Sequence, residues 1–223
     1  MIVLAGGRAA RLGGADKPGL RVGDRTLLEA VVGAGTEAGA RPVVVVGPER
    51  PGLAGAPRFV QEEPPGGGPV PALRRGLGEL GRAPWVAVLA ADLPFLRAAH
   101  LAALLSAAAR ADGAVLVDGT GREQWLAGCW RAGALRRAAG GYTGASLRGL
   151  LGPLRPAHLR LEPGPGEPPP WLDCDTDADL RGARDWHTRA RRQATSPGTT
   201  TLRSGSPATN RRTCCATNWA ASG

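Results

Sequence analysis

The sequence predicts an α/β fold, a single three-layer domain in which a mainly parallel sheet lies between helices. Two observations support this prediction. Short apolar runs without polar alternation, which are typical of strands covered on both faces, alternate with segments of helical periodicity. The chain has 223 residues, of which 43% are hydrophobic, so it is long enough for one domain with a sizeable core and short for two.

Strands and helices are expected to alternate along the first half of the chain. The run "PVVVVG" illustrates the strands, and the first helix carries apolar side chains at helical spacing, with Asp24 as its predicted cap. In chain order we expect a strand at 1–5, a helix at 26–38, strands at 42–47 and 59–61, a helix at 69–80, a strand at 85–94 and a helix at 97–110.

The second half gives weaker signals of the same kind. The last helix is expected to be capped by Thr176 and is rich in acidic residues at its start, which suits the positive end of a helix dipole. The expected elements are strands at 114–117, 127–130 and 158–161, a helical stretch near 142–151, a Pro/Gly loop at 162–170 and a helix at 176–186. Ligands of parallel sheets bind beyond the carboxyl ends of the strands, so candidate sites are expected there.

The composition divides the chain into a domain at 1–187 and a tail at 188–223. The tail is rich in Ser, Thr and Arg, has few apolar residues and is expected to be disordered. Residues 181–223 hold eight arginines against Asp185 and carry most of the formal net charge of +9. Such a tail could bind polyanions without specificity, but the nearly neutral body does not indicate a specific nucleic-acid-binding protein.

Cysteine and histidine spacing excludes other classes of site. Neither zinc-binding spacing nor a disulfide framework is present, so reduced thiols in a cytoplasmic protein are expected. The sequence shows no secretory signal and no uninterrupted apolar window of about 18 residues, and we expect no membrane partner. The cysteines are Cys129, Cys174, Cys214 and Cys215. His100, His158 and His187 are isolated from one another in the sequence and receive no catalytic role.

A glycine-rich segment follows the first predicted strand. In "LAGGRAARLGG" the backbone amides of Gly6 and Gly7 could approach a polyphosphate, and Arg8 and Arg11 would add positive charge. The alternative is a flexible turn, because glycine is frequent throughout the chain.

Lys17 is the only lysine among 28 lysine and arginine residues. A compact ammonium acts as a point charge between phosphate oxygens, whereas a guanidinium suits planar, bidentate partners. A phosphate contact would explain why a lysine stands here, and chance is the alternative.

Acidic residues follow two of the predicted apolar segments. Asp92 should stand at the carboxyl end of its strand, where a magnesium ligand is expected, and Asp173 and Asp175 would share a face if their segment is extended. A carboxylate at Glu62 or Glu63 could accept the two neighbouring N–H groups of guanine. The alternatives are a turn before Pro94, a cap on the next helix and a solvated acidic pair.

With these motifs in place, the chain resembles the MobA-like nucleotidyltransferases and is most similar to the molybdenum cofactor guanylyltransferases among them. The likeness runs from Met1 to about Trp186. It is carried by "LAGGRAARLGGADKP", "EEPPGGGPVPAL", "AADLP" and "DCDTDADL", of which the first, with its "GGxDK" spacing, is the most specific. The resemblance implies a Rossmann-like three-layer fold.

The resemblance also implies roles for individual residues. Lys17, Asp92 and Arg11 would be catalytic, Asp92 and Asp175 would lie at Mg²⁺, and Glu63 would stand where the family usually has an aspartate facing guanine. The implied nucleotide-binding residues are Leu4, Ala5, Gly6, Gly7, Arg8, Lys17, Glu63 and Asp92.

The chain departs from the family pattern at three places. Glu63 is one methylene longer than aspartate, which makes guanine recognition less secure than nucleotide binding. Gly47 ends the second strand where the family can carry an asparagine. The first strand starts at Met1, whereas relatives usually have several preceding residues, so the start is expected to be truncated.

The implied reaction transfers GMP from GTP to the terminal phosphate of molybdopterin and releases pyrophosphate. A phosphate monoester is mostly ionised near neutrality, with a second pKa of about 6, so no general base is required. Proteins of molybdenum insertion or molybdoenzyme maturation are further implied partners. The alternatives are a transferase that uses CTP or a sugar phosphate, and a nucleotide- or polyanion-binding protein without catalysis.

Overall fold

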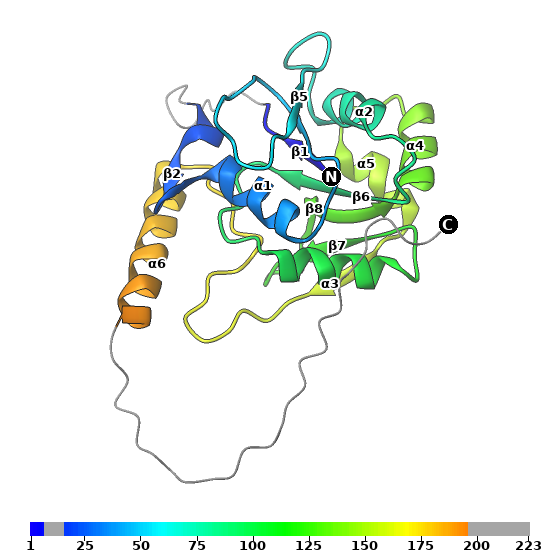
Figure 1. Ribbon diagram of the computed structural model, residues 1–223. Helices are drawn as coiled ribbons and strands as arrows, with labels where there is room; N and C mark the ends of the chain where they lie inside the picture. The colour runs from blue at the N-terminus through cyan, green and yellow to red at the C-terminus, as the bar shows by residue number, and fades with distance from the viewer. Residues whose placement is uncertain (7–15, 196–223) are drawn as a thin grey trace.

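The computed structural model describes residues 1–6 and 16–195. A seven-stranded sheet of order β5-β4-β1-β6-β8-β7-β9 forms its centre (Figure 1). Its strands are β1 (Ile2–Leu4), β4 (Val44–Val46), β5 (Arg58–Val60), β6 (Trp85–Ala90), β7 (Gly113–Val117), β8 (Glu123–Arg131) and β9 (Ala157–Arg160). The predicted three-layer α/β domain is confirmed.

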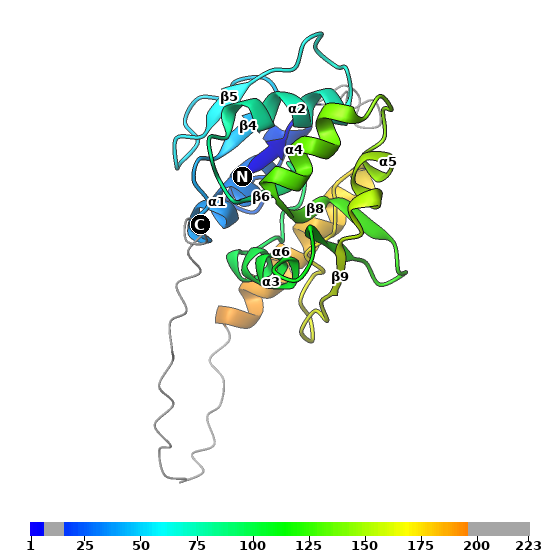
Figure 2. The same ribbon diagram turned by 90° about the vertical axis from the view of Figure 1, so that its right-hand side faces the viewer.

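Helices cover both faces of the sheet. Figures 1 and 2 show α1 (Leu27–Glu37) and α3 (Ala98–Ala108) on one face, and α2 (Pro69–Glu79), α4 (Ala132–Gly141) and α5 (Leu147–Leu151) on the other. Val3 belongs to the core under α1 and α3, and its neighbours Ile2 and Leu4 belong to the core under α2 and α4. Because both faces are buried, every position of the strand is apolar.

The strand directions create one edge where several carboxyl ends meet. Strand β1 pairs in parallel with β4 and β6, and β4 pairs in parallel with β5. Strand β8 is antiparallel to both β6 and β7, and its pairing with β7 shifts register between Val115 and Leu116. The carboxyl ends of β1, β4, β5 and β6 therefore lie along the same edge.

The predicted cap of α1 is wrong. Thr26, not Asp24, caps α1: its hydroxyl accepts from the Glu29 N–H, and the Glu29 carboxylate accepts from the Thr26 N–H. Asp24 instead lies in the turn between the short strands β2 (Arg21–Val22) and β3 (Arg25–Thr26). A capping box needs the acidic partner three positions after the cap, and Thr26 has this spacing to Glu29 whereas Asp24 does not.

Two helices also differ from the prediction. The stretch near 142–151 contains only α5, and α4, which precedes it, was not predicted because its glycines and arginines weaken the helical signal. Helix α6 (Asp177–Thr195) continues beyond residue 186, so the expected disorder does not begin at residue 188. Residues 196–223 lie outside the described part of the chain.

The segment before α6 is anchored by a small third core. Cys174 is buried there with Val22 and Leu27, and with Leu180 and Ala183 of α6. Burial raises the pKa of the Cys174 thiol, and that of Cys129 in the main core, to about 12; both cysteines are free.

Among the described residues, no helix combines the length and apolar character that a membrane span needs.

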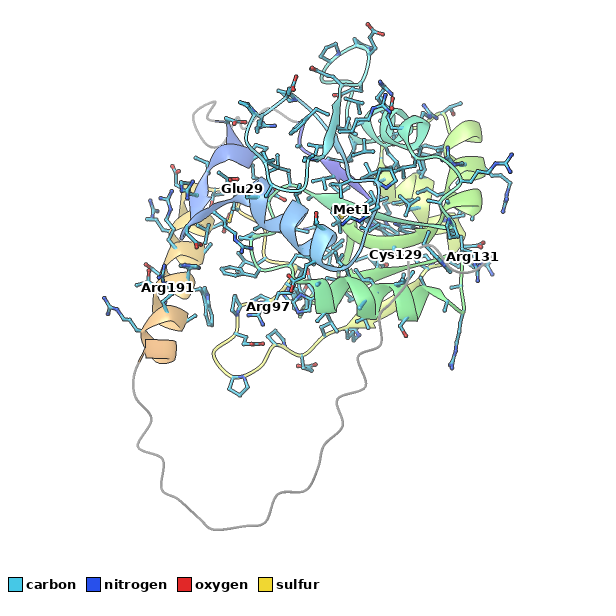
Figure 3. The ribbon with its side chains drawn as sticks, in the orientation of Figure 1. Met1, Glu29, Arg97, Cys129, Arg131 and Arg191 are labelled. Carbon is cyan, nitrogen blue, oxygen red and sulfur yellow. The ribbon has the colours of Figure 1, made fainter. Side chains whose placement is uncertain are left out.

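Figure 3 shows Met1 and Cys129 inside the molecule and places Glu29 and Arg131 toward opposite ends of the sheet. Glu29 marks the side of the carboxyl ends, and Arg131, paired with Trp85 at the start of β6, marks the other.

Candidate active site

A cavity of about 620 Å³ opens at the carboxyl ends of β1 and β6. The loop after β5 and the first turn of α2 form another wall, and Leu126 of β8 contributes an apolar one. Helix α2 thus begins at the cavity, and the positive end of its dipole favours an anion there. The predicted site residues that line the cavity are Leu4, Ala5, Gly6, Lys17, Asp92 and Asp175.

Three charged side chains from distant parts of the chain meet in this cavity. Lys17 begins the short 3₁₀ helix η2 (Lys17–Gly19), Asp92 follows β6, and Asp175 precedes α6. The Lys17 ammonium donates one hydrogen bond to Asp92 Oδ2 and another to Asp175 Oδ1 at 2.5 Å. The structure therefore brings Lys17, Asp92 and Asp175 together, and we call this group the lysine cluster.

Burial and opposite charge act against each other on Lys17. Its side chain is 17% exposed. Burial lowers the pKa of Lys17, but the attraction of Asp92 and Asp175 outweighs burial, and the pKa lies above its ordinary value. Lys17 therefore stays a cation at neutral pH.

The acids around Lys17 outnumber it within the described residues. Burial, and then repulsion from Asp175 and Asp92, raise the pKa of the nearby Asp173. Asp92 Oδ1 is buried and has no hydrogen-bond partner among the residues that the structure describes. A buried acceptor without a partner is costly, so this oxygen indicates a site for a further cation or donor.

Asp92 and Asp175 fit a magnesium ion. Carboxylate oxygens are its preferred protein ligands, and Mg²⁺ is usually held by one or two carboxylates together with substrate phosphates. In the described parts of the chain no group of three or more His, Cys, Asp or Glu side chains is placed to hold a metal. A two-carboxylate site completed by phosphate oxygens agrees with both observations.

Glu62 lines the cavity, and Glu63 does not. Glu62 is 6% exposed and accepts the Gly66 N–H at 2.9 Å, whereas Glu63 is exposed. Side chains alternate beyond β5, so that Val60 and Glu62 point inward while Gln61 and Glu63 do not. The structure therefore does not bring Glu63 to the site; counting this alternation from Val60 would have selected Glu62.

Gly47 has a steric reason to be glycine. Its φ is +152°, and a Cβ there would lie 2.9 Å from the Ala5 carbonyl carbon and 3.1 Å from the Gly6 nitrogen. The end of β4 thus packs directly on the backbone that leaves β1. An asparagine at this position would require both segments to move apart.

Three predicted site residues lie outside the described part of the chain, and two residues near the site were not predicted. Gly7, Arg8 and Arg11 lie outside the described residues, and their expected roles stay predictions. Sequence reasoning gave no role to Asp16 or Arg50, which form an ion pair next to Lys17. Asp16 is the aspartate of the "GGxDK" motif, which was the available signal for it.

The matching family model and the similar named proteins indicate the same family. Residues 1–159 match the family model described as MobA-like NTP transferase domain. A protein of Mycobacterium avium, named probable molybdenum cofactor guanylyltransferase, is 34% identical over 189 residues, which are 81% of this chain and 92% of the relative. A protein of Opitutus terrae with the same name is 38% identical over 124 residues, 54% of this chain and 61% of that one.

Solved structures share the fold. A crystal structure from Mycobacterium sp. strain JC1, of a homologue of a Mycobacterium tuberculosis protein, has a TM-score of 0.67 at 22% identity and covers 85% of this chain and 96% of its own. The 2-C-methyl-D-erythritol 4-phosphate cytidylyltransferase of Thermus thermophilus has a TM-score of 0.62 at 22% identity, covering 86% of this chain and 98% of its own.

Proposed function

Because the chain belongs to the MobA-like NTP transferase family and is therefore a nucleotidyltransferase, we propose that it transfers GMP from GTP to the terminal phosphate of molybdopterin, or of its molybdenum-bearing form. Pyrophosphate is the second product. The relatives that carry the name molybdenum cofactor guanylyltransferase, at 34% and 38% identity, support this choice of donor and acceptor.

The lysine cluster is the observation that carries the proposal. It lies in a cavity of about 620 Å³, within the range of about 300–1,000 Å³ that small-molecule sites occupy. The Lys17 ammonium suits phosphate oxygens, and Asp92 Oδ1, which has no hydrogen-bond partner within residues 1–6 and 16–195, suits a metal bound to them. Both groups lie at the carboxyl ends of parallel strands, beside the start of α2.

The reaction needs alignment and charge neutralisation rather than a general base. The acceptor phosphate, with a second pKa of about 6, already carries the nucleophilic oxygen near neutral pH. That oxygen attacks the α-phosphorus of GTP, the bond to the β-phosphate oxygen breaks, and pyrophosphate leaves with its electron pair. Lys17 exchanges its aspartate partners for phosphate oxygens and offsets the charge that develops as pyrophosphate departs. Mg²⁺, held by Asp92 and Asp175, would neutralise further phosphate charge.

Glu62 takes the role of base recognition that Glu63 was expected to have. One Glu62 oxygen accepts the Gly66 N–H, and the carboxylate also faces the cavity. A carboxylate can accept the ring N–H and the exocyclic amine of guanine together, which neither cytosine nor adenine offers in the same arrangement. Glu62→Gln should weaken GTP binding, and Glu63→Gln, as the matched control, should leave it unchanged.

The experiment that tests the proposal is a pyrophosphate-release assay with GTP, CTP and ATP, each with and without molybdopterin. We expect release that requires both GTP and molybdopterin. Preference for CTP would overturn the choice of base, and release without molybdopterin would overturn the acceptor. Nucleotide binding without any turnover would favour a non-catalytic binding protein. Removal of residues 196–223, the part of the predicted tail that follows α6, would then show whether the tail causes the binding.

A further inference from the structure

Arg50 and Asp16 form a doubly bonded ion pair close to the cavity. Arg50 Nε donates to Asp16 Oδ2 at 3.1 Å, and Nη2 donates to Asp16 Oδ1. The third nitrogen, Nη1, donates to the Pro48 carbonyl at 2.9 Å. All three guanidinium nitrogens therefore have acceptors, and the Arg50 side chain is only 15% exposed. Such a fork fixes the orientation of both partners, which a single-point contact does not.

On one side, the pair is continuous with the turn that carries Lys17. The Asp16 carbonyl accepts the Gly19 N–H at 2.9 Å and closes η2. The Asp16 carboxylate lies over the same turn, since a Cβ on Gly19 would come within 2.6 Å of Asp16 Oδ2. Any movement of Asp16 therefore changes the turn from which the Lys17 side chain extends.

On the other side, the pair is attached to the end of β4. Pro48, which accepts from Arg50, directly follows Gly47. Gly47 in turn packs against the backbone of Ala5 and Gly6 at the cavity. Arg50 thus connects the Lys17 turn to the rigid strand ends of the sheet.

A second ion pair shows what an ordinary surface contact looks like in this chain. Arg97 Nη1 donates to Glu167 Oε1 at 3.1 Å, with 56% of the arginine side chain and 49% of the glutamate side chain exposed. Exposed pairs of this kind contribute little to stability. The Arg50 pair differs in its second bond, in the burial of its arginine and in its place next to the predicted phosphate-binding lysine, although the Asp16 side chain is 59% exposed.

We propose that Arg50 is a positioning residue that acts through Asp16 to hold the Lys17 ammonium toward the cavity. It does not act by touching the nucleotide, because Arg50 does not line the cavity and its guanidinium is bonded to Asp16 and to the Pro48 carbonyl. The inference rests on the proposed function, in which the partner of Lys17 is a phosphate of the nucleotide.

The first test uses the fact that Lys17 is the only lysine in the chain. An amine-selective reagent is applied to the nucleotide-free protein, and peptide mapping follows the label at Lys17 separately from any label at the amino terminus. In Arg50→Ala the turn is released, and Lys17 should be labelled about tenfold faster than in the wild type. Arg50→Lys keeps the charge without the fork and should give an intermediate rate.

Asp16→Asn removes the negative charge of the same ion pair and should reproduce the faster labelling of Lys17 that Arg50→Ala gives. Arg97→Ala removes an arginine from the surface pair and should label at the wild-type rate. Circular dichroism and thermal unfolding establish that each variant is folded. Equal labelling of Lys17 in the wild type and in folded Arg50→Ala would overturn the proposal.

The second test separates positioning from a general effect on the fold. Calorimetric titration with MgGTP should show about tenfold weaker binding for Arg50→Ala, and no further loss when Arg50→Ala is added to Lys17→Met. Additive losses would mean that Arg50 acts independently of Lys17 and would contradict the proposal. If the wild type binds neither GTP nor CTP, the proposed function fails, and the labelling experiment still decides the role of Arg50.

Discussion

Two three-charge clusters lie at opposite ends of the parallel strands. At the carboxyl ends, an ammonium lies between two carboxylates, and at the amino ends, where β5 begins and α2 ends, a carboxylate lies between two guanidiniums. The first is the lysine cluster of Lys17, Asp92 and Asp175, and the second, the glutamate cluster, consists of Glu79, Arg58 and Arg75.

The clusters differ in what they leave unsatisfied. In the glutamate cluster both Glu79 oxygens have cationic partners, Oε2 with Arg58 at 2.7 Å and Oε1 with Arg75. In the lysine cluster the buried Asp92 Oδ1 has no hydrogen-bond partner among the described residues, and it borders a cavity. The presence of ion pairs therefore does not distinguish the two clusters, whereas the unsatisfied acceptor at the cavity of about 620 Å³ does.

The largest expected effect is that of Asp92→Asn, which removes a charge that the proposed metal site needs. Turnover in the pyrophosphate-release assay should fall about 10³-fold. Glu79→Gln is the matched control, since it makes the same chemical change in the other cluster, and it should retain turnover. Near-wild-type activity in folded Asp92→Asn would remove the distinction between the two clusters.

Lys17→Arg should lower turnover about 10²-fold although the charge is retained. A planar guanidinium is larger than an ammonium and prefers bidentate partners, so in the proposed reaction it should not replace Lys17 in the exchange of Asp92 and Asp175 for phosphate oxygens. Steady-state kinetics measure the loss, and Arg75→Lys in the glutamate cluster is the control without effect on kcat. Full activity in Lys17→Arg would show that the shape of the ammonium does not matter.

Lys17→Met should bind Mn²⁺, a probe for Mg²⁺, at least about tenfold more tightly than the wild type when no nucleotide is present. The Lys17 ammonium competes with a metal for Asp92 and Asp175, and methionine removes this competing charge. Electron paramagnetic resonance of free Mn²⁺ measures the affinity without reference to turnover. Equal or weaker binding would mean that the aspartates do not hold the metal.

The smallest effect is expected in the glutamate cluster. The bond from Arg75 holds the pKa of Glu79 below its ordinary value of 4.5, so the folded state favours the carboxylate. This contribution to stability is present above pH 4.5 and is lost as the pH falls through the lowered pKa. Thermal unfolding of Glu79→Gln should show a small decrease in Tm at pH 7 that disappears in acid, and a decrease that grows in acid would contradict this assignment.

The sequence predicted correctly those elements that follow from the local pattern of apolar residues. Unbroken apolar runs such as the one ending at Val46 predicted the parallel strands, because strands buried on both faces need apolar side chains at every position. Strand β8 was predicted only over its apolar end, because its first residues are polar and its ladder with β7 is irregular. Pairing between strands supplies that information, and local pattern does not.

The same limit applies to the site. Lys17, Asp92 and Asp175 could be selected from the sequence because each follows or precedes a recognisable element, and the structure brings them together. Glu63 was selected by motif although strand alternation directs Glu62 inward, and Arg50 gave no signal, since its partner is 34 residues away. Contacts across such separations depend on the packing of strand ends, which one sequence does not specify.

The most direct measurement of the central claim is a crystal structure with Mg²⁺ and a non-hydrolysable GTP analogue. The account predicts a triphosphate in the cavity, with Lys17 Nζ within hydrogen-bonding distance of a phosphate oxygen and the metal on Asp92. A nucleotide bound elsewhere, with Lys17 still paired to Asp92 and Asp175, would contradict it.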